Sequence, residues 1–232
     1  MNAFIQFFGE HLKRLPTTYE WAVRPKTKAG LPNFQWHPTS GTMDECIAMK
    51  QHLTTAWNEA EDNERQRLAH WIVADWGGVR ANNPTTVAQY VSNFAGGTFN
   101  TPLKGVASYS KILSVINCLE YAIYDARVAA ALNAVQVLYN STAQPRYFAH
   151  VPSRNTVIKN FISWFAKNEL GKPTWERIPY DATYTEYKQL LHDLKNHFPT
   201  YEVYHFEMVL FSMAPCLCER AMKVATLHYP DK

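Results

Sequence analysis

Asp125 is the first candidate for chemistry, because it stands alone between an apolar triplet and an alanine-rich segment in the stretch AIYDARVAAALN, residues 122–133. Aspartate is a preferred N-cap residue, since its side chain accepts hydrogen bonds from the first free backbone N–H groups of a helix. Those bonds and the helix dipole also favour the ionised carboxylate. A carboxylate so placed can stabilise a cationic sugar in a dissociative cleavage or take a proton from a nucleophile. We therefore expect Asp125 to be both a helix cap and a catalytic group.

Lys111 is the second candidate, and it lies at the edge of an apolar helical stripe that contains Ile112 and Val115. Two interpretations are open. Its stem can lie along the core while the ammonium group stays in water. Alternatively, partial burial lowers its pKa, so that a neutral amine can attack an electrophilic carbon and form a Schiff base.

Helical periodicity dominates the chain that must position these two residues. Strand signals are few and short, so we predict an all-α protein of about eight to ten helices joined by short loops. The helix after Asp125 has alanines at 129–131 beside its apolar stripe, which predicts a central helix with a close neighbour. Residues 1–42 are expected to form a short helix and an irregular Pro-, Gly- and Lys-rich extension, and residues 43–232 the main helical domain.

Composition narrows the function classes. A net charge of +3 over 232 residues permits contact with an anionic polymer but is below that of an obligate nucleic-acid binder. Cys216 and Cys218 lack the second ligand pair of a zinc site, so we expect reduced thiols, no metal and no cofactor. Glu10 and His11 interrupt the first apolar segment, and no apolar run approaches the roughly 20 residues that span a bilayer. We therefore expect a cytoplasmic protein without membrane contact that acts as a monomer.

The run KGVASYSKILSVINCLEYAIYDARVAAALN, residues 104–133, resembles the centre of the helix-hairpin-helix DNA glycosylase superfamily, in particular its 8-oxoguanine glycosylase-like branch. Members of that superfamily have a hairpin of the kind Leu-Pro-Gly-Val-Gly, then a lysine in the bifunctional enzymes, then an aspartate at the start of the next helix. LKGVA at 103–107 is similar to the hairpin, with Lys104 in place of its proline and Ala107 in place of its second glycine. Lys111 and Asp125 match the lysine and the aspartate, although their separation of 14 residues is shorter than usual.

This resemblance implies a two-lobed helical glycosylase-like fold with a degenerate helix-hairpin-helix and an active site between the lobes. It implies base flipping in double-stranded DNA that contains a modified base, followed by cleavage of the N-glycosidic bond with Asp125 stabilising the sugar. Attack by Lys111 at C1′ would add strand nicking. Anti-phage glycosylases that remove glucosylated hydroxymethylcytosine belong to this branch, and an 8-oxoguanine repair glycosylase/lyase is the alternative within it.

An extruded base needs side chains that hold it and its phosphates. The candidates are aromatic rings near the hairpin and Asp125 and polar groups in short turns: Trp76, Tyr109, Tyr124, Arg80, Asn82, Arg127, Arg154 and Asn155. Each aromatic can equally fill the core, and each polar group can equally cap a helix or face solvent. Residues 141–178 carry an excess of four positive charges, which agrees with a phosphate-binding face.

Two other function classes stay open from the sequence. A non-catalytic helical DNA-binding module would use Asp125 only as a cap and Lys111 only for phosphate, and its binding would fall steeply with salt. An all-α scaffold that binds another protein would bind no DNA at all.

Overall fold

The computed structural model describes residues 1–31, 33–36, 41–80, 83–95, 100–139, 144–170, 172 and 174–228. Within these residues the chain is mostly helical, which confirms the predicted helical class. The helices are α1 (Asn2–His11), η1 (Leu12–Arg14), α2 (Leu15–Thr18), α3 (Pro25–Lys28), α4 (Thr42–Glu59), α5 (Asp62–His70), η2 (Trp71–Trp76), α6 (Pro84–Ala95), α7 (Val106–Ile116), α8 (Ala126–Leu138), α9 (Thr156–Asn168), α10 (Thr183–His197) and α11 (Val203–His228). The described strands, β1 (Arg146–Tyr147) and β2 (Glu176–Arg177), form one short parallel pair.

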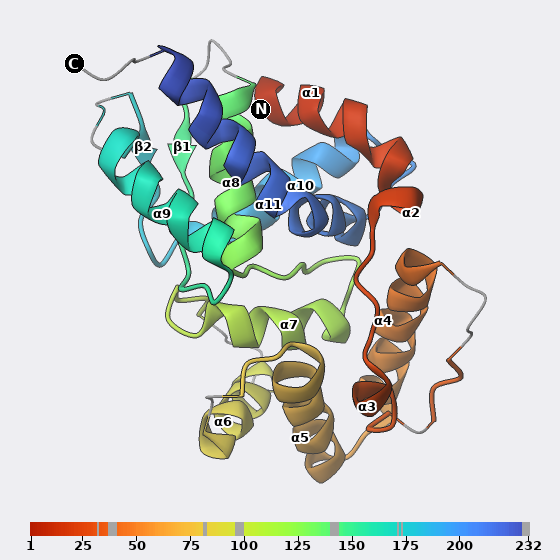
Figure 1. Ribbon diagram of the computed structural model, residues 1–232. Helices are drawn as coiled ribbons and strands as arrows, with labels where there is room; N and C mark the ends of the chain where they lie inside the picture. The colour runs from red at the N-terminus through yellow and green to blue at the C-terminus, as the bar shows by residue number, and fades with distance from the viewer. Residues whose placement is uncertain are drawn as a thin grey trace.

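The helices form two groups that meet along one side of α7. Figure 1 shows α1 and α8–α11 in the upper part of the view and α4–α7 below them. The segment between α2 and α3 descends beside α4 and connects the first group to the second. Residues from both groups line the cavity described below.

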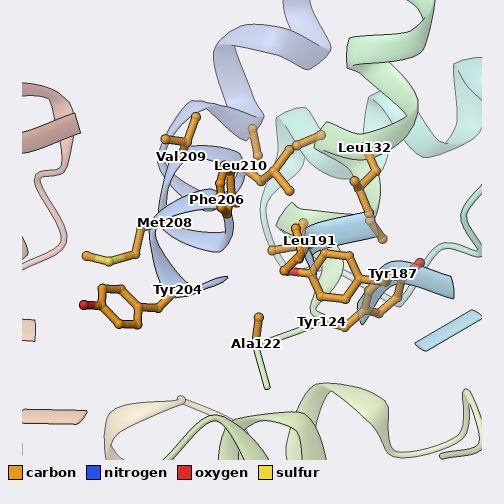
Figure 2. Close-up of a cluster of buried hydrophobic side chains, with 14 of the residues drawn as sticks. Ala122, Tyr124, Leu132, Tyr187, Leu191, Tyr204, Phe206, Met208, Val209 and Leu210 are labelled. Carbon is orange, nitrogen blue, oxygen red and sulfur yellow. The ribbon is translucent and has the colours of Figure 1, made fainter. Parts of the chain in front are cut away.

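The predicted central position of the helix after Asp125 is confirmed. In α8, Ala129, Ala130, Ala131 and Ala134 have no exposed surface, and α8 packs closely along α11. Such small side chains let two helix backbones approach. Figure 2 shows large side chains from both helices and from α10 filling the space at the end of this contact, among them Leu132, Phe206 and Leu210.

The helix α1 shares this core. Phe4, Phe7 and Phe8 of α1 are buried, and the Phe8 ring lies edge-on to Phe206 of α11 with centroids 5.2 Å apart. The predicted first helix is therefore present, and it packs against the main helical domain. Part of the predicted irregular extension, Tyr19 to Arg24, runs past the cavity without helical structure.

None of the helices in the described part of the chain is both long enough and apolar enough to pass through a bilayer.

Candidate active site

A cavity of about 1100 Å³ lies where the two groups of helices meet. Its described wall comes from the segment before α3, from α4, η2 and α7, from the turns that precede α7, α8, α9 and α10, and from α11. Five basic and three acidic side chains belong to that wall: Lys50, Lys104, Lys111, Arg127, Arg154, Asp125, Asp181 and Glu207. The volume is somewhat above the roughly 300–1,000 Å³ of typical ligand pockets, so a nucleoside-sized or larger ligand fits.

Asp125 caps α8, as predicted, and also lines the cavity. Its Oδ1 accepts hydrogen bonds from the backbone N–H groups of Arg127, at 2.9 Å, and Val128, at 3.1 Å. Among the described residues Oδ2 makes no hydrogen bond, so this oxygen is free to interact with a ligand. The cap fixes the carboxylate through one oxygen and leaves the other for chemistry.

The three residues before Asp125 are held by buried tyrosines and a buried serine. The hydroxyl groups of Tyr184 and Tyr187 donate to the carbonyl oxygens of Ala122 and Ile123, at 2.9 and 3.1 Å. The N–H of Tyr124 donates to Ser110 Oγ at 3.0 Å. Because these partners are themselves packed in the core, the carboxylate of the following residue has a fixed position, which catalytic groups require.

Lys111 is 5% exposed, so the interpretation that places its ammonium group in water is wrong. Its Nζ donates to the carbonyl oxygen of Ala107 at 2.5 Å. Burial lowers the pKa of Lys111, and the carboxylates of Asp125 and Glu207 partly oppose this effect. Burial disfavours a charged amine, so the neutral, nucleophilic form is easier to reach here than on a surface.

The cavity wall also contains a buried ion pair. Lys50 Nζ of α4 lies 2.7 Å from Glu207 Oε2 of α11, and the two side chains are 2% and 4% exposed. Burial raises the pKa of Glu207, while Lys50 opposes the rise. The sequence contained a weak signal for this pair, since Lys50 falls within an apolar helical stripe and Glu207 stands between Phe206 and Met208. Their pairing across 157 residues was not predicted.

The segment matched to the degenerate hairpin connects α6 to α7. Gly105, the N-cap of α7, has a φ of 82°, which glycine adopts without strain. A Cβ at this position would also lie 2.1 Å from the hydroxyl oxygen of Tyr90 in α6. Lys104, in place of the hairpin proline, is exposed at the cavity and can contact a phosphate.

Four of the predicted binding residues belong to the cavity wall. Trp76 ends the π-helical turn η2 beside the cavity, and π-turns are frequent at functional sites. Arg127 and Arg154 lie at the wall, and Asn155 caps α9 by accepting from Ile158 N–H at 3.1 Å. Since α7, α8 and α9 all begin at this wall, three helix N-termini and their positive dipole ends meet there.

The other predicted binding residues are elsewhere. Tyr109 and Tyr124 have no exposed surface, and their hydroxyls donate to the carbonyl oxygens of Pro102 and Ala149, at 2.8 and 2.7 Å. The prediction that they contact a base is therefore wrong: both are core residues that hold the turns around the cavity. Arg80 is exposed and does not line the cavity, and Asn82 lies outside the described residues.

The basic segment 141–178 is partly neutralised. Arg146 Nη1 lies 2.8 Å from Glu186, and Lys172 Nζ lies 2.8 Å from Glu169. Arg154 is the cation of this segment that reaches the cavity in the described structure. Fewer cations of this segment are therefore placed to bind phosphate at the cavity than the count of charges indicated.

Gly77 packs against the stem of Lys111. A Cβ at position 77 would lie 2.5 Å from Lys111 Cδ, 2.7 Å from Cε and 2.8 Å from the carbonyl oxygen of Ile72. Gly77→Ala is expected to lower the free energy of unfolding by about 1–3 kcal/mol, the usual effect of overpacking. Urea denaturation measures it, and a Lys111→Ala background supplies the control because it removes part of the clash. If Gly77→Ala lowers the free energy of unfolding equally with Lys111 present and with Lys111→Ala, the contact between residue 77 and the Lys111 stem is contradicted.

His150, which lines the cavity, has a ring packed among Tyr147, Phe161 and Phe165. Neither ring nitrogen has a hydrogen-bond partner among the described residues. Burial lowers the pKa of His150 to about 4 from the ordinary 6.5. This residue is therefore neutral in the folded protein at neutral pH.

The shifted pKa of His150 predicts a loss of stability in acid. The unfolded chain takes up the His150 proton near pH 6.5 and the folded chain only near pH 4, so the stability falls as the pH is lowered between these values. At pH 4, His150 is expected to have lowered the free energy of unfolding by about 3 kcal/mol relative to neutral pH. Urea denaturation between pH 7.5 and pH 4.5 measures it, with His150→Phe as the comparison. Equal pH dependence of wild type and variant would refute the assignment.

Comparison with family models, curated proteins and solved structures finds no match to this chain. In the described residues, no three His, Cys, Asp or Glu side chains gather in a way that could hold a metal ion.

Proposed function

We propose that the protein is a DNA N-glycosylase that binds a modified nucleotide extruded from the duplex and hydrolyses its N-glycosidic bond, leaving an abasic site. The observation that carries this proposal is the presence of a positioned carboxylate, Asp125, and a buried amine, Lys111, in the wall of one nucleoside-sized cavity. The helical fold is accordingly proposed to be a two-lobed glycosylase-like fold with a degenerate helix-hairpin-helix.

In this mechanism the free oxygen of Asp125 faces the sugar as the bond to the base breaks. Positive charge develops on the sugar ring in an oxocarbenium-like transition state, and a fixed carboxylate stabilises that charge. The carboxylate needs little reorganisation, because Ser110, Tyr184 and Tyr187 already hold the turn before it. The same geometry lets Asp125 accept a proton from an attacking nucleophile.

Lys111 supplies the second activity. Its lowered pKa makes the neutral amine easier to reach. The amine can attack C1′ as the base departs, opening of the sugar ring then gives a Schiff base, and elimination of the 3′ phosphate nicks the strand. Glu207 and Lys50 lie in the same wall, and the Glu207 carboxylate partly offsets the effect of burial on the Lys111 amine.

Phosphates flank an extruded nucleotide and need cations at the edge of the cavity. Lys104, Arg127 and Arg154 lie there, next to the N-termini of α7, α8 and α9. Basic side chains and helix N-termini both bind phosphate oxygens. These groups position the DNA and read no sequence.

The cavity volume favours a bulky modified base. A base that carries a sugar, such as the glucosylated hydroxymethylcytosine of phage DNA, needs more room than an oxidised purine, and removal of such a base would defend a cell against phage. 8-oxoguanine is the alternative substrate.

The decisive experiment is incubation with duplexes that each contain one modified base, including 8-oxoguanine, together with glucosylated phage DNA. Alkali-labile abasic sites should form on at least one of them. Binding that falls steeply with salt, with no abasic product on any duplex, would instead indicate a non-catalytic DNA-binding module.

Borohydride trapping tests Lys111 separately. Reduction of a Schiff base should give a covalent protein–DNA adduct with the wild type and none with Lys111→Met, which keeps the apolar stem of the side chain. Lys104→Met removes a cation from the edge of the same cavity and should still be trapped. Base release without any adduct would assign Lys111 a structural role only.

A further inference from the structure

Three side chains from distant parts of the chain form an aromatic and cationic cluster in the cavity wall. The Trp21 and Phe211 rings lie 5.1 Å apart between centroids at an interplanar angle of 88°. The guanidinium carbon of Arg127 lies 4.8 Å from the Phe211 centroid and 5.6 Å from the Trp21 centroid. All three residues line the cavity, and we call them the Trp21 cluster.

The Trp21 ring is unusually accessible for its type. It is 42% exposed, although tryptophan gains much stability from burial. Arg127 has no acidic partner among the described residues, so its guanidinium is held by the two rings alone. An accessible indole and an unpaired planar cation at the edge of a cavity form a surface that can stack on a planar ligand.

The backbone on both sides of Trp21 is anchored. Tyr19 is buried, its hydroxyl donates to Cys46 Sγ at 3.5 Å, and its carbonyl oxygen accepts from the Thr42 hydroxyl. Val23, on the other side, is 5% exposed. The indole therefore projects from a fixed segment, and little conformational entropy is lost when a ligand stacks on it.

The Trp21 cluster lies next to the proposed reaction centre. Arg127 follows Asp125 by two residues at the N-terminus of α8. Phe211 follows Glu207 by four residues of α11, about 6 Å along the helix axis, and both line the cavity. A nucleotide with its sugar beside Asp125 would thus have its base within reach of the cluster.

Given the proposed function, we propose that the Trp21 cluster is the stacking site for the extruded nucleobase. The segment before α3 then supplies part of the substrate site. Stacking on an indole does not depend on base identity, because every base has a π-face. The cluster therefore supplies affinity for the base, and other groups must distinguish one base from another.

The test compares two fluorescein-labelled duplexes in an anisotropy titration at low salt. One has a central mismatched cytosine, which is easily extruded, and the other has a tetrahydrofuran abasic analogue at the same place. Stacking on one aromatic ring corresponds to roughly 5- to 150-fold in affinity, so the wild type should prefer the cytosine duplex by about this factor. Trp21→Ala should lose this preference and keep its affinity for the abasic duplex.

Three further variants test whether the preference for the cytosine duplex depends on the Trp21 cluster. Trp21→Phe keeps a ring and should retain most of the preference. Arg127→Met removes the planar cation and one proposed phosphate contact, so it should weaken binding to both duplexes and also reduce the preference. Trp164→Ala alters a half-buried tryptophan of α9 that does not line the cavity, so it should behave as wild type.

An unchanged preference in Trp21→Ala, or equal weakening on both duplexes, would overturn the stacking site and leave the glycosylase proposal intact. The absence of abasic product on every modified duplex would overturn the glycosylase proposal instead. A wild type that binds neither duplex at low salt would overturn both.

Discussion

Asp125→Asn is expected to lower the rate of base release by about 10²- to 10³-fold or more, while the protein stays folded and still binds DNA. The amide keeps the shape of the carboxylate and can still cap α8, because asparagine is as good an N-cap as aspartate. What it loses is the negative charge that faces the developing sugar cation, and single charge-stabilising groups have effects of this size. Single-turnover release of the base from the active duplex measures the rate.

The control for Asp125→Asn is a cap at another helix. Asn83 precedes α6, accepts a hydrogen bond from Thr85 N–H at 3.0 Å and does not line the cavity. Asn83→Ala should cost about 1 kcal/mol of unfolding free energy and leave base release unchanged. Full activity in Asp125→Asn would show that Asp125 is only a cap.

Lys50→Met is expected to lower the free energy of unfolding by about 3–5 kcal/mol, the largest stability effect that the structure predicts for one side chain in the cavity wall. The substitution leaves Glu207 buried without its partner 2.7 Å away. Burial raises the pKa of Glu207, so part of the loss is relieved by protonation of the carboxyl group, increasingly so at lower pH. Urea denaturation at pH 7 and pH 5 measures both the cost and its pH dependence.

Two comparisons separate pairing from packing. The double variant Lys50→Met/Glu207→Leu removes both charges and should recover most of the stability, because a buried ion pair can be replaced by apolar groups at little cost. Glu64→Gln breaks the exposed pair with Arg67 and should cost less than about 1 kcal/mol. A double variant as unstable as Lys50→Met would mean that the lysine stem, and not the charge, is what the fold requires.

The features that could be predicted from the sequence depend on local patterns. The spacing of apolar residues predicted the helical class and the central position of α8, since periodicity reports which face of an element is buried. Asp125 was predicted as a cap from its residue type and its place before an alanine-rich run, because capping involves only the next three residues. The left-handed turn at Gly105 is a local feature of the same kind.

Other features depend on which distant segments meet, and only the tertiary structure decided them. Tyr109 and Tyr124 were as plausible in a binding site as in the core, and packing placed both in the core. Lys111 stood at the edge of its stripe, and tertiary packing, with Gly77 against its stem, buried it.

The local pattern of this chain determined a helical protein with a capping carboxylate at residue 125. Long-range packing determined that Lys50 pairs with Glu207 across 157 residues and that Trp21 meets Phe211 and Arg127 beside the cavity. The physical reason is that helix periodicity and caps are set by neighbours within about four residues, whereas the pKa, burial and partners of a side chain are set by whatever surface the fold brings against it.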